Sequence, residues 1–205
     1  MEGSTRRSRD IKQINFAYTE DITAVSKRQY EIHLKLYAGY VSKANEIDGI
    51  LANERVKNGN ATYSEYRGLK KGQSYALDGV ILHELYFKNM GGGRVNVCEG
   101  LTGCINKSFG GYDRWLADFK ACADSARGWA ILAYEQRSGA LANILLDTHD
   151  EGHVMGAFPI LVLDMYEHAY FIDYANNKDE YFGRFMANVN WNAVNKRYEA
   201  LGLMP

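Results

Sequence analysis

The stretch "FPILVLDMYEHAYFIDY", residues 158–174, decides how the second half of this chain is interpreted. Its first six residues are all apolar, which is typical of a strand that is buried on both faces. Asp164 ends this run, and Glu167 and His168 follow within about one helical turn. Because a buried carboxylate is costly unless a charge or a metal compensates it, the segment predicts a partner for Asp164.

The spacing of Asp164 and His168 predicts that both side chains serve one site. If the chain turns helical after the strand, positions i and i+4 lie on one side of the helix. The alternative is that Asp164 caps the following helix while His168 is exposed to solvent. That alternative explains Asp164 less well, because it leaves a carboxylate where the run should be covered on both faces.

Two further histidines lie on the apolar faces of long predicted helices. Apolar residues at steps of three and four predict an amphipathic helix from about residue 25 to residue 55, with His33 on its stripe. The turn-like residues 57–66 separate it from a second helix within residues 72–90, whose apolar face includes His83. The pair predicts an antiparallel helical hairpin.

Histidines on such faces have two possible roles. They are more often hydrogen-bonded core residues than metal ligands, and on that view the chain is a helical scaffold without metal. Two facing helices that each bury one histidine instead favour a metal site between them. Three imidazoles and one carboxylate suit a first-row metal such as Fe, Mn or Zn. The candidate ligands are His33, His83, Asp164 and His168.

The second half of the chain changes from helical to strand periodicity. A glycine-rich linker is expected at residues 91–103, and a helix over residues 112–126. Three short apolar runs then predict strands, with a hairpin turn at "QRSG" between the first two. The chain returns to helix over residues 181–202, stopping at Gly202 and Pro205. The predicted strands are residues 128–135, 139–147 and 158–164.

The predicted fold class is α+β. A long N-terminal antiparallel helical hairpin is followed by an α/β domain with a three-stranded antiparallel sheet. The boundary is expected at the glycine-rich linker, which gives a helical hairpin domain over residues 1–92 and an α/β domain over residues 93–205.

Composition narrows the classes of partner and the compartment. The formal net charge of −1 argues against nucleic acid or a membrane surface as a partner. No apolar stretch approaches the roughly 20 residues that span a bilayer. Cys98, Cys104 and Cys122 cannot all pair and are expected to be reduced thiols, with a local Cys98–Cys104 disulfide as the alternative. We therefore expect a cytoplasmic protein, with the mitochondrial matrix less favoured.

Several segments resemble the iron/manganese superoxide dismutase family. The block "DMYEHAYF" at 164–171, followed by "NW" at 190–191, resembles the family's C-terminal signature. "GVILHELYFKNM" at 79–90 resembles its second-helix motif, and "YEIHLKLYAGY" at 30–40 its first-helix motif. "ARGWAILAYE" at 126–135 is similar to its first strand. The resemblance covers about residues 20–200, and the Asp-Glu-His block is highly specific.

The resemblance implies an activity and roles for particular residues. The implied reaction converts superoxide into dioxygen and hydrogen peroxide at one Fe or Mn ion per subunit. Trp129 matches an aromatic wall of the metal pocket. Glu167 matches the residue that reaches the partner subunit, and Tyr170 the tyrosine at that interface and the entrance channel, so a homodimer or a dimer of dimers is implied. The residues that match the metal ligands are His33, His83, Asp164 and His168.

The chain departs from the family pattern around the implied metal. Tyr166 stands where the family usually has Trp, and Ile131 replaces a second Trp. Tyr40 lies one residue closer to the first ligand than the family's entrance tyrosine usually does. Because this spacing is close to two helical turns, Tyr40 is still expected to face the site and relay protons, with Tyr37 as the competitor.

Gly79 and His149 bear on the choice of metal. Typical iron members carry a Gln one turn before the second ligand, where this chain has Gly79. In manganese members a donor to the metal's solvent molecule comes from the end of the second strand, and His149 matches it here. A surface-loop histidine is the alternative. The pattern slightly favours Mn, or a site that works with either metal. His153, in the following loop, is expected to be only solvated.

The departures leave an alternative function open. A divergent family member could have retuned or lost dismutase activity and could act on another small substrate or serve as a metal-binding protein. Tyr166, His149 and the shifted Tyr40 all make that alternative conceivable.

Overall fold

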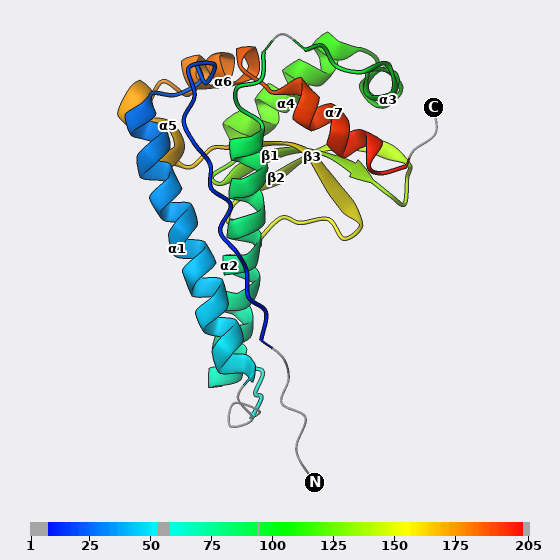
Figure 1. Cartoon of the computed structure of the whole chain (residues 1–205). Helices are drawn as coiled ribbons and strands as arrows, with labels where there is room; N and C mark the ends of the chain where they lie inside the picture. Colours follow the sequence, from blue (N-terminus) through cyan, green and yellow to red (C-terminus); the bar gives the residue numbers. More distant parts are fainter. Residues whose placement is uncertain (1–7, 53–57, 94, 203–205) are drawn as a thin grey trace.

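A hairpin of two long antiparallel helices forms the first half of the fold (Figure 1). The computed structural model describes residues 8–52, 58–93 and 95–202. Helix α1 spans Lys27–Ala52 and helix α2 spans Glu65–Lys88. Helix α2 begins inside the segment predicted as a turn, because Ser64 caps it by accepting a 3.0 Å hydrogen bond from the Arg67 main-chain N–H. The predicted helix end near residue 55 lies outside the described residues.

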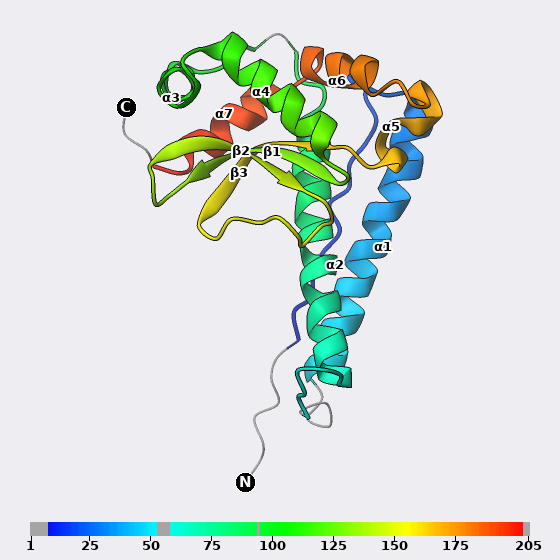
Figure 2. The same cartoon turned by 180° about the vertical axis from the view of Figure 1, so that it is seen from behind.

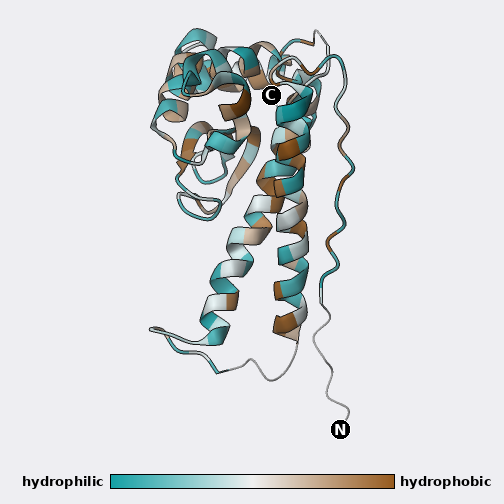
Figure 3. Cartoon of the chain, turned by 90° about the vertical axis from the view of Figure 1, so that its left-hand side faces the viewer, coloured by the Kyte–Doolittle hydropathy of each residue, from teal (hydrophilic) through white to brown (hydrophobic). Residues whose placement is uncertain are grey.

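The apolar stripe predicted for the first helix is the face that packs against α2. Along both helices hydrophobic and hydrophilic residues alternate, as expected for amphipathic helices (Figure 3). The buried members of the stripe in α1 include both candidate-site and ordinary core residues: Tyr30, His33, Tyr37, Ala44, Ile47 and Leu51. Tyr40 is only partly buried.

A three-stranded antiparallel sheet forms the centre of the second half (Figure 2). Its strands are β1 (Trp129–Glu135), β2 (Ala140–Leu146) and β3 (Ala157–Asp164), in the order β2-β1-β3. The turn between β1 and β2 closes with a 2.9 Å hydrogen bond from Gly139 N–H to the Glu135 carbonyl, as predicted for this hairpin. The register places Trp129 directly opposite Asp164. The ends of β1 and β3 nearest α2 thus carry two residues of the candidate site.

Five shorter helices complete the described part of the second half. Helices α3 (Glu99–Phe109) and α4 (Tyr112–Ser125) precede the sheet. Helices α5 (Glu167–Tyr174), α6 (Lys178–Ala187) and α7 (Trp191–Glu199) follow it. Helix α4 contacts β1 and β2, whereas α2 and α7 contact β3. The predicted α+β class with a helical hairpin and a three-stranded sheet is confirmed.

Two element predictions need correction. The linker predicted over 91–103 extends too far, because α3 begins at Glu99 and buries Leu101 and Ile105. The single C-terminal helix predicted over 181–202 is broken at residues 188–190, where Val189 forms an isolated bridge with Met90. Asn190 then caps α7 by accepting a hydrogen bond from the Ala193 main-chain N–H. The predicted stop at Pro205 lies outside the described residues.

An extended N-terminal segment runs beside the hairpin in both Figure 1 and Figure 3. Its Arg9 forms a 2.7 Å ion pair with the buried Asp48 of α1. Further along, the Ile14 main-chain N–H donates to the hydroxyl of Tyr37 at 2.9 Å. Within the described ranges, none of the helices combines the length and apolar character needed to cross a bilayer.

Candidate metal centre

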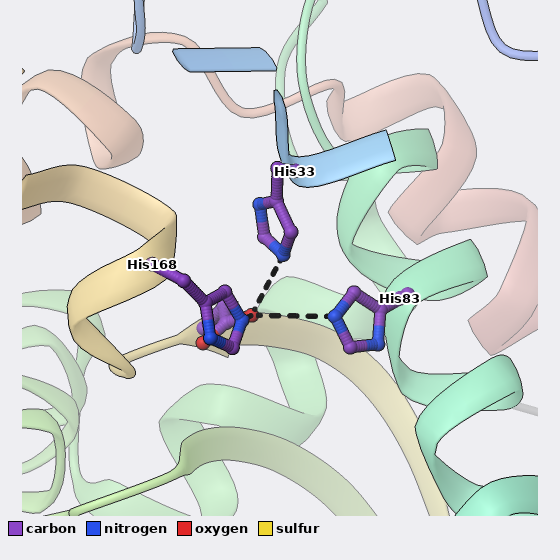
Figure 4. A group of neighbouring side chains, drawn as sticks. His33, His83 and His168 are labelled. Carbon is purple, nitrogen blue, oxygen red and sulfur yellow. Dashed lines mark hydrogen bonds and ion pairs between the residues drawn. The ribbon is translucent and has the colours of Figure 1, made fainter. Parts of the chain in front are cut away.

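Four side chains from four different elements converge on one point (Figure 4). His33 comes from α1, His83 from α2, Asp164 from the last position of β3 and His168 from the first turn of α5. One possible ligand atom from each residue lies within 4.8 Å of the others. The predicted cluster therefore forms. Asp164 and His168 do not share a helix, however, because the chain leaves the strand at Asp164 and becomes helical only at Glu167.

Asp164 lies at the centre of the cluster and is fully buried. Its Oδ2 is 3.2 Å from Nε2 of both His33 and His168, and 3.9 Å from Nε2 of His83. Its Oδ1 accepts a 2.9 Å hydrogen bond from the Tyr166 main-chain N–H. Burial alone would raise the pKa of Asp164, but His168 and His33 outweigh it and hold that pKa far below its ordinary value. The carboxylate is therefore ionised.

The histidine nitrogens fit a metal better than a hydrogen-bonded core. His33 Nε2 and His83 Nε2 are buried and have no hydrogen-bond partner among the described residues besides the nearby Asp164 carboxylate. His83 Nδ1 lies 2.6 Å from the Gly79 carbonyl and donates to it, which leaves a lone pair on Nε2. Burial lowers the pKa of His83 to about 3, so its ring is neutral. A buried imidazole lone pair beside a carboxylate is the donor chemistry of Fe, Mn or Zn sites.

His168 differs from the other two histidines in its exposure and protonation. Its side chain is 26% exposed. Burial opposes protonation there, but the carboxylate of Asp164 outweighs burial and raises the pKa of His168. A metal that binds this ring has to displace the proton, so binding will release protons at low pH.

Trp129 and His149 form the wall of the cluster beside the sheet. The Trp129 indole Nε1–H donates a 2.9 Å hydrogen bond to His149 Nδ1. Because an indole nitrogen can only donate, His149 Nδ1 must accept, and the proton of the neutral ring lies on Nε2. That Nε2 is buried and has no hydrogen-bond partner in the part of the chain that the structure describes. Since burial lowers the pKa of His149 to about 4, the ring is neutral and offers one free N–H.

Gly79 makes room for Tyr40 and His149 against helix α2. The Tyr40 ring centroid lies 5.1 Å from that of His83 and 4.7 Å from that of His149. A Cβ on Gly79 would lie 3.0 Å from Tyr40 Cδ1 and 3.2 Å from His149 Cδ2. Tyr37, the competitor for the entrance position, is buried and donates its hydroxyl to Glu84 at 2.8 Å. Tyr40 rather than Tyr37 therefore faces the cluster.

Two more tyrosines line the outer side of the cluster. Tyr166 stacks on His168 with centroids 5.1 Å apart and donates its hydroxyl to the Asp147 carbonyl at 3.4 Å. Tyr75, which the sequence reasoning missed, lies 4.5 Å from His149 between ring centroids and is 37% exposed. Burial, reinforced by the neighbouring Tyr75, raises the pKa of Tyr40. Its phenol therefore stays protonated at neutral pH.

The remaining predicted site residues lie around the cluster rather than in it. Glu167 is exposed in the first turn of α5, and Tyr170 is buried against Tyr181 with ring centroids 5.0 Å apart. Ile131 is buried in the interior of β1. His153 is exposed, as expected, but it is not only solvated: its Nε2 donates to the His149 carbonyl at 2.8 Å and lies 3.4 Å from the Asp78 carboxylate.

Comparisons with known proteins agree with this geometry. A family profile described as iron/manganese superoxide dismutases, C-terminal domain, matches residues 98–197. The chain is 40% identical over 185 residues to the iron superoxide dismutase of Aquifex aeolicus, covering 88% of this chain and 87% of that protein. It is 34% identical to a manganese superoxide dismutase of Halobacterium salinarum, covering 80% of each. An iron superoxide dismutase of Saccharolobus solfataricus is 33% identical, covering 85% of this chain and 86% of that protein. The chain belongs to the iron/manganese superoxide dismutase family.

Proposed function

We propose that this protein disproportionates superoxide to dioxygen and hydrogen peroxide at a single Fe or Mn ion held by the four-residue cluster. The observation that carries the proposal is the buried set of three imidazoles and one ionised carboxylate, in which two Nε2 atoms have no other partner among the described residues. When bound, the ion supplies the redox chemistry by alternating between its trivalent and divalent states.

His149 is assigned as the hydrogen-bond donor to a solvent molecule at the centre. The assignment is supported by its buried, unpartnered Nε2 and by the Trp129 bond that fixes the proton there. With an ion bound, this N–H would donate to a water or hydroxide at the centre. Such a donor would help to set the reduction potential of the ion.

Tyr40 is assigned to proton delivery and to control of entry. Its ring packs beside those of both His83 and His149, and its raised pKa keeps a proton on the phenol oxygen. Two protons are needed for each peroxide formed, so a protonated group beside the centre shortens their path. Tyr166, stacked on His168, gives this side a phenol where the family usually has Trp.

The site is proposed to work with either metal, with Mn slightly favoured. The support is that His149 rather than a side chain at Gly79 supplies the donor. Relatives named for iron are 33 to 40% identical to the chain and a relative named for manganese is 34% identical, so both metals occur among similar proteins.

The assembly and location are also proposals. Glu167 and Tyr170 are assigned to the contact between two subunits, since Glu167 is exposed on the helix that carries His168. The assembly would be a homodimer or a dimer of dimers. The three unpaired cysteines support a cytoplasmic location. We place the division between the helical and α/β domains at residue 92, just after α2.

The test is a superoxide-consumption assay on protein reconstituted separately with Fe and with Mn. We expect activity with at least one metal, at one ion per chain by elemental analysis. His83→Ala should abolish metal binding, whereas the matched histidine variant His149→Gln should keep the metal and change only the activity. Full occupancy without activity in either form would overturn the dismutase assignment and favour a retuned family member. Protein that binds no metal, with stability unaffected by a chelator, would instead favour a helical scaffold.

A further inference from the structure

The loop that carries His149 is attached to helix α2 at two points. At the first, the Ser74 hydroxyl donates a 2.9 Å hydrogen bond to Asp150 Oδ2. At the second, His153 Nε2 lies 3.4 Å from Asp78 Oδ2. Ser74 and Asp78 are one helical turn apart on α2, so they present their side chains on the same side of that helix.

These two contacts lie close to His149, the residue assigned as hydrogen-bond donor to the solvent molecule. His149 lies immediately before Asp150, and its carbonyl accepts a 2.8 Å hydrogen bond from His153. Asp78 directly precedes Gly79, the position against which the His149 ring packs. The His153 side chain therefore contacts both the main chain of His149 and helix α2, against which the His149 ring packs.

The ring of His149 is also held by the 2.9 Å hydrogen bond from the Trp129 indole N–H. Within the described residues, Asp147 accepts at its carbonyl from Tyr166 at 3.4 Å and forms a 3.6 Å ion pair with the exposed Arg127. Both contacts of Asp147 are long, and this residue precedes His149 in the sequence. The two contacts to α2 involve residues that follow His149 in the sequence. The loop is exposed there, over residues 151–156.

We propose that the contacts His153–Asp78 and Asp150–Ser74 position His149, so that helix α2 holds both the metal ligand His83 and the hydrogen-bond donor in a fixed relation. His153 and Asp78 are positioning residues, because neither touches the cluster. The proposal rests on the assignment of His149 to the solvent molecule, but the docking of the loop can be tested without it.

One of the two contacts depends on pH. The charged groups that face His153 are Asp78 from α2 and Asp150 from its own loop. The Asp78 carboxylate, 3.4 Å from Nε2, outweighs burial and raises the pKa of His153 above its ordinary value of 6.5. The ion pair is therefore complete below that value and is lost as the pH rises through the raised pKa. Deprotonation should loosen the loop around His149.

The Trp129 indole N–H reports directly on the position of His149, to which it donates. The chain has three tryptophans, so the indole N–H region of a nitrogen-15 NMR spectrum contains few signals, and Trp129→Phe assigns the relevant one. We would titrate the full chain loaded with zinc, which is diamagnetic. We expect the Trp129 signal to shift with one midpoint above pH 6.5. His149 itself cannot produce this shift, because its pKa is lowered to about 4.

Three variants decide the origin of the shift. His153→Gln keeps a donor but cannot titrate, so the response should disappear; Asp78→Asn should move its midpoint down. Glu151→Gln is the matched control, because it removes an exposed carboxylate from the same loop and should leave the midpoint unchanged. A wild-type titration that persists in His153→Gln, or no shift in the wild type, would overturn the proposal.

A second measurement connects docking with the reaction. The double variant Ser74→Ala/His153→Ala removes both contacts, each of which is partly exposed to solvent. We expect turnover to fall about 2- to 5-fold and the midpoint potential to shift, with metal content unchanged. Threonine in place of this alanine at position 74 restores a hydroxyl. A recovery of turnover in that protein would support the role of the hydroxyl. An unchanged potential and turnover would show that the contacts do not position His149.

Discussion

Replacing Gly79 by alanine tests whether the space on α2 is needed by the site. The new Cβ would lie 3.0 Å from Tyr40 Cδ1, 3.1 Å from Tyr40 Cγ and 3.2 Å from His149 Cδ2. Contacts this short require both rings to move by a few tenths of an ångström. The His149 ring cannot move freely, because it is also bound by Trp129.

The expected change in stability is a balance of two opposing effects. An alanine in a helix interior is favoured over glycine by about 1 kcal/mol. Overpacking of a filled site costs about 1 to 3 kcal/mol. Gly39→Ala is the matched control, since Gly39 is an exposed position inside α1 whose added Cβ meets nothing within 4 Å. Gly39→Ala should therefore stabilise the protein, and Gly79→Ala should be less stable than that control by about 1 to 3 kcal/mol.

The assay combines urea unfolding of the metal-loaded proteins with their turnover rates. Gly79→Ala should also lower turnover, because Tyr40 and His149 are displaced together, whereas Gly39→Ala should match the wild type. If Gly79→Ala gains as much stability as Gly39→Ala and keeps full turnover, the site does not need the close packing of the two rings on α2.

Three further predictions concern other parts of the chain. Arg9→Ala should lower the free energy of unfolding by about 2 kcal/mol at neutral pH. Because the Arg9 hydrogen bond lowers the pKa of Asp48 from 3.8 to about 2, this deficit should vanish as the pH falls through that range, and a deficit independent of pH would contradict the reasoning. Arg197→Gln should lower the free energy of unfolding, measured with urea, by about 2 kcal/mol, because three oxygen acceptors lose their hydrogen bonds from the guanidinium. Arg197→Lys should not restore these hydrogen bonds. Tyr75→Phe should move the alkaline loss of activity to lower pH, because Tyr75 helps to raise the pKa of Tyr40; an unchanged profile would exclude that coupling.

The ligands were predictable because each one interrupts a regular pattern. His33 and His83 lie on apolar helical stripes, and Asp164 ends a buried strand, so burial could be inferred before any contact was known. Their convergence could not be derived from spacing alone, since it depends on how α1, α2 and β3 pack. The resemblance to the family supplied that step.

Other features are determined by contacts between distant segments. The linker prediction includes the first part of helix α3 because Gly100 and Gly103 lower its helical propensity, yet burial of its apolar residues outweighs that cost. The break between α6 and α7 depends on pairing with residues next to α2, which no local pattern reveals. Tyr75 lies four residues before Gly79 and eight before His83, so it shares their helical face, but an exposed tyrosine gave no reason to single it out.

The division of the ligands between two halves of the chain has a consequence for how an ion enters and leaves. Two ligands belong to the hairpin and two to the second half, one at the end of β3 and one in α5, and three of the four are almost fully buried. A bound ion is thus a cross-link across a large loop of the chain and should oppose separation of the halves. Gln29 of α1 also joins them, since its side-chain N–H donates to the His168 carbonyl at 2.5 Å. Metal exchange should therefore be as slow as the opening of α1 from α5, and the exchange rate should follow amide hydrogen exchange in those two helices.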